Sequence, residues 1–245
     1  MNPAHRRTDA PTHRCCGGHG GTGARGHGRA VACAISALTA LVLWTRPAVA
    51  QLGVSGSAAA AFAEHRVSAG RGTEQSSGTL LGGHGKIVVG SRFELAGQVL
   101  GGQLTADSAS SDDLDLAELE VRASVLPAPW LALQGGFSAR SYATTFARQR
   151  WMAARFGAEV RLAFVGGALR GVLRGELLPA VSVNDLENPS GAFAAAAGLE
   201  WRGGILAAAV QYSLERYDFP LVGDVRRREQ LSVLTGRVGL SLGRP

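Results

Sequence analysis

The segment WMAARFGAEVRLAF, residues 151–164, alternates between two kinds of side chain. Met152 and Phe156 belong to a set that is entirely apolar, whereas Arg155 and Glu159 belong to the set that carries the charges. Successive side chains of a β-strand point to opposite sides, so a period of two over this length predicts a strand with two unlike faces. The fold must therefore offer an apolar environment to one face and a polar environment to the other.

The first fifty residues differ from the rest of the chain. Residues 1–29 are rich in Gly, His and Arg, and residues 30–44 form an apolar run, AVACAISALTALVLW. This run is shorter than the roughly 20 residues that a membrane-spanning helix needs. The small residues Ala48-Val49-Ala50 follow it, directly before Gln51. We expect residues 1–50 to be a signal peptide cleaved after Ala50, with a retained anchor as the alternative, and residues 51–245 to be the exported domain.

Charge and cysteine content change when this segment is set aside. Residues 1–50 carry six of the 25 Lys and Arg residues, one of the 19 Asp and Glu residues and all three Cys residues. Residues 51–245 then have 19 basic and 18 acidic residues and no thiol, so disulfides and Cys-ligated metals are excluded there. Nucleic acid is not expected as a partner because no basic stripe remains. No cofactor or metal motif is present, and none is expected.

Residues 51–245 read almost entirely as strands separated by turn residues, with no helical periodicity. An all-β fold of about ten strands is predicted, and eight strands are possible if one hairpin is over-read. The predicted strands are 52–66, 78–89, 93–105, 114–126, 130–142, 149–164, 168–182, 191–202, 204–216 and 229–242.

Short and long connections alternate along this domain. The short connections are 90–92, 127–129, 165–167 and 202–204. The long connections are 68–78, 106–113, 143–148, 184–191 and 216–228. Outer-membrane barrels have short periplasmic turns and longer extracellular loops. The pattern therefore predicts a transmembrane up-and-down antiparallel β-barrel with both termini on the periplasmic side.

Three features favour an apolar outer face and a charged lumen. The apolar faces of the predicted strands are long and unbroken. The single lysine of this domain, Lys86, leaves Arg as nearly its only cation, and Arg suits a confined lumen rich in carboxylates. Aromatic residues gather near strand ends, as in the girdles at lipid interfaces, and the predicted girdle is Phe62, Phe93, Phe164, Phe193, Trp201 and Tyr212. A soluble barrel and a periplasmic β-sandwich are the alternatives.

Residues 51–245 thus resemble the small outer-membrane β-barrel proteins of Gram-negative bacteria, through topology and alternation and not through a sharp motif. The last strand, LSVLTGRVGLSLGRP, keeps the alternation but lacks the terminal aromatic residue that is usual in that class. The resemblance implies export to the outer membrane, contact with its lipid and lipopolysaccharide, folding by the barrel-assembly machinery and a monomeric state.

The predicted inward positions carry balanced charges. Glu159 is expected opposite Arg174, Glu176 one diagonal step from Arg155, and Arg140 near Glu118. Because narrow barrels are filled by their side chains, we expect an interior packed with ion pairs, with a narrow porin-like channel as the alternative. The lumen-lining charged residues are predicted to be Lys86, Glu94, Glu118, Glu120, Arg122, Arg140, Arg155, Glu159, Arg161, Arg170, Arg174, Glu176, Glu200, Glu215 and Arg237.

An enzyme is the third hypothesis, because omptin proteases and lipid A-modifying barrels place catalytic groups near the outer rim. The exported domain offers only His65 and His84 as histidine bases. His65 is expected to be exposed and without a catalytic partner, so no catalytic residue is predicted and a structural or loop-mediated binding role is favoured. Residues 226–228, a run of three arginines in the last long connection, are candidates for contact with lipopolysaccharide phosphates.

Overall fold

The computed structural model describes residues 52–108, 112–144, 147–184 and 186–242. The predicted signal peptide and its cleavage site lie outside these residues. The described residues form ten strands and one short 3-10 turn, η1 (Val165–Gly167). The strands are β1 (Leu52–Ala69), β2 (Gly72–Val89), β3 (Phe93–Ala106), β4 (Leu114–Ala128), β5 (Leu131–Ala143), β6 (Arg148–Phe164), β7 (Leu169–Val183), β8 (Gly191–Gly203), β9 (Leu206–Val222) and β10 (Val225–Leu242).

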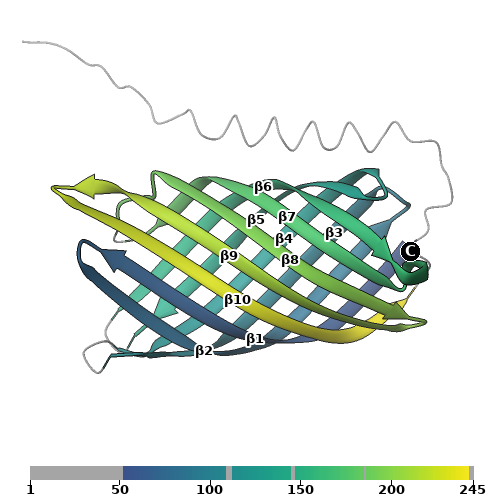
Figure 1. The fold of residues 1–245 in the computed structure, drawn as a ribbon, viewed down its shortest axis with the longest axis horizontal. Helices are drawn as coiled ribbons and strands as arrows, with labels where there is room; N and C mark the ends of the chain where they lie inside the picture. The colour runs from purple at the N-terminus through teal and green to yellow at the C-terminus, as the bar shows by residue number, and fades with distance from the viewer. Residues whose placement is uncertain (1–51, 109–111, 145–146, 185, 243–245) are drawn as a thin grey trace, which may run out of the picture. The chain divides into compact units, whose positions relative to one another are not determined.

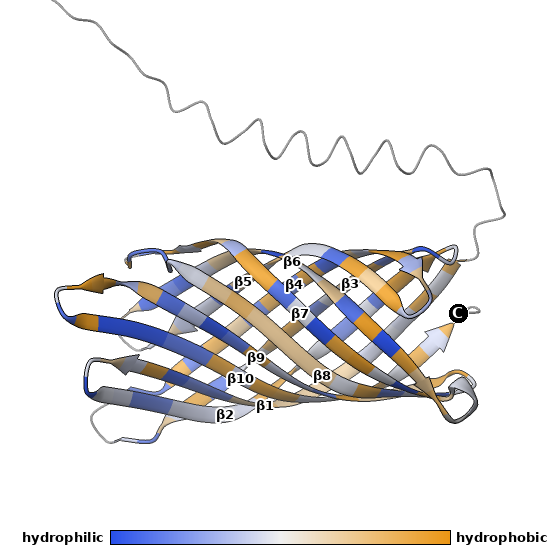
Figure 2. Ribbon diagram, turned by 45° about the horizontal axis from the view of Figure 1, so that its top comes forward, coloured by the Kyte–Doolittle hydropathy of each residue, from blue (hydrophilic) through white to orange (hydrophobic). Residues whose placement is uncertain are grey.

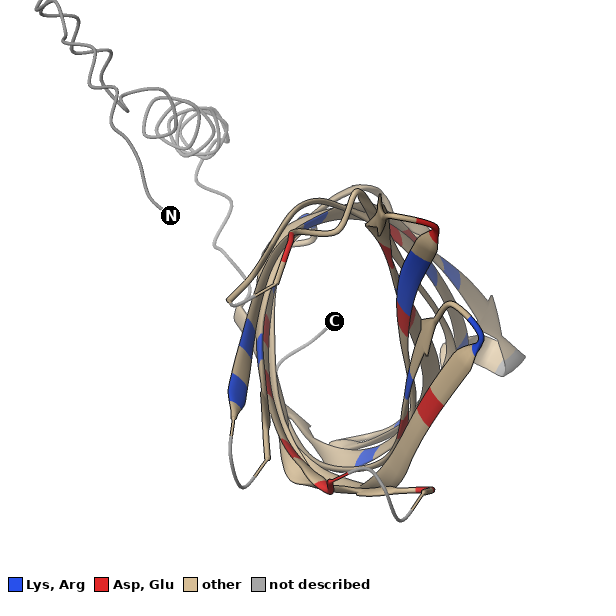
Figure 3. Ribbon diagram, turned by 90° about the vertical axis from the view of Figure 1, so that its left-hand side faces the viewer, with Lys and Arg blue, Asp and Glu red and all other residues tan. Residues whose placement is uncertain are grey.

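The strands close into an up-and-down antiparallel barrel. Each strand pairs with its neighbours in sequence, and β1 pairs with β10 from Val54↔Leu242 to Ala69↔Arg227. Figure 1 shows the strongly tilted strands from the side, and Figure 3 shows the closed ring seen along its axis. The prediction of ten strands is confirmed, and the eight-stranded alternative is wrong.

Two of the five predicted long connections are in fact tight turns. The β1–β2 hairpin turns at residues 70–71 and the β9–β10 hairpin at residues 223–224. Gly70 and Gly223 adopt positive φ angles of 58° and 60°, which glycine tolerates without steric cost. The flanking polar residues were expected to be loop, but they continue the antiparallel ladder because polar side chains pair across it at a solvated edge. Both hairpins extend at the end of the barrel opposite the start of β1 and the end of β10 (Figure 1).

The apolar face of each strand points outward and the charged face points into the lumen. Along β6, Met152 and Phe156 are 63% and 57% exposed on the outside, whereas Arg155 is 2% exposed inside the lumen. Figure 2 shows the same banding of apolar and polar residues along the strands. A soluble barrel would bury the apolar set, so the described residues have the arrangement of a transmembrane barrel. No helix within them is long and apolar enough to cross a bilayer.

Candidate functional site in the barrel lumen

The lumen contains a central cluster of ion pairs, which we define as Glu118, Glu120, Arg122, Arg140, Arg155, Glu176 and Glu215. Its residues come from β4, β5, β6, β7 and β9, and their positions follow from the alternation, which points every second side chain inward. The side chains of all seven residues are buried or nearly so, with exposed fractions of 15% or less. Charges in such a place are tolerated only when they are paired and hydrogen-bonded.

Glu215 on β9 connects opposite walls of the barrel. Its Oε2 accepts a hydrogen bond of 2.6 Å from Arg140 Nη2 on β5, and its Oε1 accepts one of 2.6 Å from Arg155 Nη1 on β6. The Tyr217 hydroxyl donates a further bond of 2.7 Å to Oε2. One carboxylate thus receives three donors, two of them charged, and holds two guanidinium groups across the bore.

Glu176 on β7 plays a similar part toward β4 and β6. Arg122 Nε donates to its Oε1 at 2.9 Å, and Arg155 Nη2 donates to its Oε2 at 2.7 Å. Arg122 also pairs with Glu120 on its own strand. Arg155 therefore joins both carboxylate hubs, Glu176 and Glu215, and the central cluster forms one connected network.

A second ionic group lies nearer the end of the barrel where β1 begins and β10 ends. Arg161 on β6 makes a bidentate contact with Glu94 on β3, at 2.8 and 2.6 Å, and its Nε donates to Glu159 Oε1 at 2.7 Å. Arg174 approaches Glu159 at 3.7 Å. This group also spans the bore, because β3 and β6 are not neighbours in the sheet.

The cross-strand pairs expected from the sequence are confirmed. Glu159 stands directly opposite Arg174, and Glu118 stands opposite Arg140 with 3.0 Å between Oε2 and Nη2. Arg155 reaches Glu176 diagonally, although a β-bulge shifts the register between Ala154 and Phe156. The turn at Gly166 and Gly167, both with positive φ, sets the register for Glu159 and Arg174.

The structure places the predicted lumen residues around one central cavity, with the exception of Arg170. Arg170 is half-buried, stands opposite Glu200 and does not line this cavity. The unfilled volume is about 90 Å³. Pockets for drug-sized molecules usually measure about 300–1,000 Å³, so the remaining space is large enough only for water or small ions.

An aromatic cap closes the lumen toward the long hairpins. We define the cap as His65, Tyr142, Trp151, Tyr217, Phe219 and Glu229. Trp151 meets Tyr217 edge-on with ring centroids 4.9 Å apart and Phe219 at 6.0 Å, while His65 stacks on Tyr142 at 4.6 Å. This cap is not among the features predicted from the sequence. The signal was present, because Tyr142 and Trp151 stand in phase with the inward residues Arg140 and Arg155.

His65 was expected to be exposed, and this is wrong. It is only 7% exposed, and its Nε2 lies 3.3 Å from Glu229 Oε2 on β10. Glu229 is held in turn by Arg227. The prediction failed because β1 runs on to Ala69, so His65 still faces into a covered part of the barrel instead of lying on its rim.

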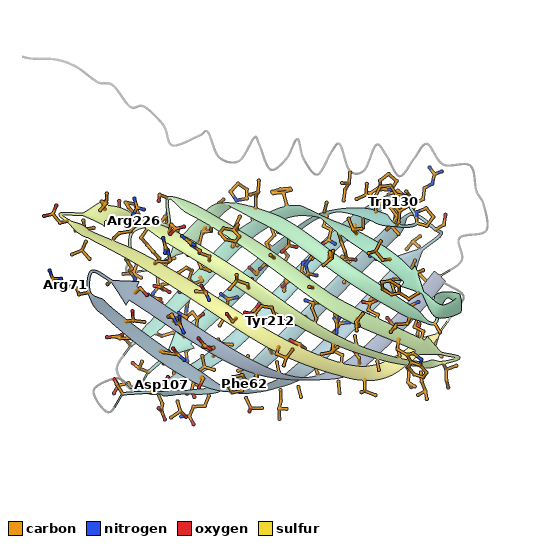
Figure 4. All side chains as sticks on the ribbon, in the orientation of Figure 1. Phe62, Arg71, Asp107, Trp130, Tyr212 and Arg226 are labelled. Atoms are coloured by element: carbon orange, nitrogen blue, oxygen red, sulfur yellow. The ribbon has the colours of Figure 1, made fainter. Side chains whose placement is uncertain are left out.

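The predicted aromatic girdle residues all lie on the outer face. Phe93, Phe164 and Trp201 stand near the short turns. Trp130, which is not among the predicted girdle residues, lies at the same end (Figure 4). Phe62 and Tyr212 lie in the middle of the barrel in the same view, not near an outer strand end. Their expected position is corrected because β1 and β9 are longer than predicted.

The described residues contain no group of three or more His, Cys, Asp or Glu side chains placed to hold a metal ion. His84 shares its part of the lumen with Lys86 and Arg237, which are cations rather than ligands. The arrangement is therefore one of charge pairing and packing, and its chemistry is the binding and orientation of charged groups.

Several solved structures of bacterial proteins are similar to this chain. The outer membrane protease OmpT from Escherichia coli matches 78% of this chain and 97% of its own, with 8% identity and a TM-score of 0.53. The translocator domain of NalP from Neisseria meningitidis matches 89% and 96%, with 16% identity and a TM-score of 0.42. Ail from Yersinia pestis matches 77% and 98%, with 10% identity and a TM-score of 0.37.

No family model matches the sequence, and no curated protein matches it. At 8% identity the likeness to OmpT concerns the fold alone, which is a closed antiparallel barrel of the bacterial outer-membrane type.

Proposed function

We propose that this protein is an outer-membrane barrel with a sealed lumen, acting as a structural element of the envelope and presenting its outer hairpins for binding. The observation that carries the proposal is the set of ion pairs across the bore, above all Arg140–Glu215 and Arg155–Glu215. An open channel needs a continuous column of water. Here guanidinium and carboxylate groups from opposite walls occupy the axis, and the aromatic cap lies beyond them.

Planar-bilayer recording tests the seal. The purified protein is expected to give no reproducible unitary conductance. The double variant Arg140→Ala/Arg155→Ala removes both guanidinium groups that reach Glu215 across the bore and is expected to admit ions. Arg92→Ala, an exposed arginine at the turn between β2 and β3, is the matched control and should stay silent. Reproducible unitary conductance from the unaltered protein would overturn the proposal in favour of a narrow channel.

The proposed role is not enzymatic. OmpT is a protease, but in this chain His65 is stacked on Tyr142 and paired with Glu229, with no free volume beside it for a substrate. A general base must reach the proton that it removes. A hydrolase or acyltransferase activity of the purified protein that disappears in His65→Ala, while the barrel stays folded, would contradict this assignment.

Lipopolysaccharide is the proposed partner at the outer end, and one arginine of the run 226–228 is available for it. Arg228 pairs with Asp218 at 2.8 Å, and Arg227 pairs with Glu229 and lies over the Phe219 ring. Arg226 is exposed near the tip of the β9–β10 hairpin (Figure 4). Arg226→Ala should therefore weaken co-purification with lipopolysaccharide as much as replacing residues 226–228 together, and an unchanged yield in both variants would exclude the contact.

A further inference from the structure

The lumen near the start of β1 and the end of β10 contains a recess whose charges are largely unpaired. Its floor is built from small residues of β9, β10 and β1, and its edges carry cations. The residues that line it include Ser55, Ser57, His84, Lys86, Glu200, Arg202, Ala207, Ala209, Arg237 and Ser241. We call this the inner recess. Its unfilled volume is about 60 Å³, which suits a small ion.

The small floor follows from the register. Ser55 stands opposite Ser241 on one side and Lys86 on the other, and Ala209 stands between Glu200 and Arg237. The lining residues that β1, β9 and β10 contribute include no Asp or Glu, so this floor supplies no carboxylate to the cations. The inner recess therefore keeps unfilled space, whereas the central cluster is filled by its side chains.

The cations of the inner recess lack strong partners. Lys86 makes no ion pair or hydrogen bond with any described residue, since Glu94 is taken by Arg161 and Glu200 lies with Arg237. The Arg237–Glu200 contact itself is long, 3.9 Å. Arg202 likewise has no carboxylate within ion-pair distance in the described part of the chain. Three cations thus face one carboxylate, Glu200, inside a confined low-dielectric space that strengthens attraction to an anion.

We propose that the inner recess binds a small multivalent oxyanion of the phosphate class. Lys86, Arg202 and Arg237 supply positive charge from two sides, and the hydroxyl groups of Ser55 and Ser241 supply neutral donors near the mouth. Phosphate oxygens accept several such bonds at once, and guanidinium groups match them in a bidentate manner. The site lies toward the end of the barrel where β1 begins and β10 ends, which is the periplasmic side in the proposed orientation.

Calorimetric titration of the detergent-solubilised full barrel tests this site. Inorganic pyrophosphate in chloride buffer is expected to bind saturably at one site, more weakly as salt is raised. Lys86→Gln and Arg237→Gln should each lower the affinity about tenfold or more, the usual effect of losing one charge-assisted bond. Arg92→Gln removes the same charge from an exposed position at the same end and should leave binding unchanged.

Two outcomes would overturn the proposal: no saturable binding of pyrophosphate or phosphate, or equal binding by wild type and Lys86→Gln. Because Lys86 has no ion pair to lose, this variant should fold, as heat-modifiable gel mobility will show; Arg202→Gln provides a second variant. Dihexanoyl phosphatidylglycerol is the second probe. Tighter binding of this lipid than of pyrophosphate would identify a phospholipid headgroup as the source of the oxyanion, and the reverse would identify a free ion.

Discussion

The central cluster and the inner recess face the same bore and use the same residue types, but only the cluster is closed. In the cluster, Arg155 meets Glu176 and Glu215 at 2.7 and 2.6 Å. In the recess, the shortest contact between opposite charges is the 3.9 Å approach of Arg237 to Glu200. The difference lies in the facing walls, which carry long acidic and basic residues in the cluster and Ser, Ala and Gly in the recess. Side-chain length across the bore, rather than charge content, decides which part of the lumen is sealed.

Glu215→Ala tests the closed part and should have the largest effect. The substitution leaves Arg140 and Arg155 without a shared carboxylate and removes the acceptor of the Tyr217 hydroxyl. Breaking a buried ion pair by removing one partner costs about 3–5 kcal/mol. The measurement is urea unfolding in detergent, followed by gel mobility of the folded and unfolded forms. A loss below about 1 kcal/mol, the usual value of an exposed pair, would mean that the cluster is solvated like a surface.

Gly157→Ala tests how tightly the cluster is packed. Gly157 stands opposite Glu176, and a Cβ at this position would lie 2.8 Å from Glu176 Cγ and closer still to the Gly175 carbonyl oxygen. Overpacking of this kind costs about 1–3 kcal/mol. Gly175→Ala is the matched control on the facing strand, because a Cβ there meets no atom within 4 Å. Equal unfolding midpoints for the two variants would contradict the close packing.

Glu200→Gln tests the open part and should have the smallest effect on stability. Its one ion pair with a described residue is long and its side chain is partly solvated, so the loss of this pair should change the free energy of unfolding by less than about 1 kcal/mol. The same change removes the one carboxylate among the cations of the inner recess and should therefore tighten pyrophosphate binding. A destabilisation as large as that of Glu215→Ala would erase the distinction between the two regions.

Contacts between residues on adjacent strands could be predicted from the sequence. The alternation in residues 151–164 gave the strand and the face that carries Arg155. The glycine turn at 166–167 fixed the register that places Glu159 opposite Arg174. Partners on adjacent strands follow from a turn and a period, so Arg140 beside Glu118 could be predicted as well.

Contacts between side chains on opposite walls of the barrel could not be predicted from the sequence. Arg140 with Glu215, and Arg161 with Glu94, join strands that are not neighbours in the sheet. Their meeting depends on strand number, tilt and stagger of the closed barrel, which no local pattern encodes. The burial of His65 was missed for a related reason. It depends on how far β1 and β10 extend beyond the apolar band. The polar residues in this part of the sequence do not distinguish a paired strand from a loop.

The sequence by itself determined that the chain forms alternating strands, that their charged face is balanced, and that neighbouring strands pair in one register, because these properties repeat every second residue or are set at a turn. The tertiary structure alone decided which charges meet across the lumen, where aromatic rings close it and where cations are left unpaired. Those outcomes depend on distances across the lumen, and these distances are fixed only when β1 pairs with β10 and closes the barrel.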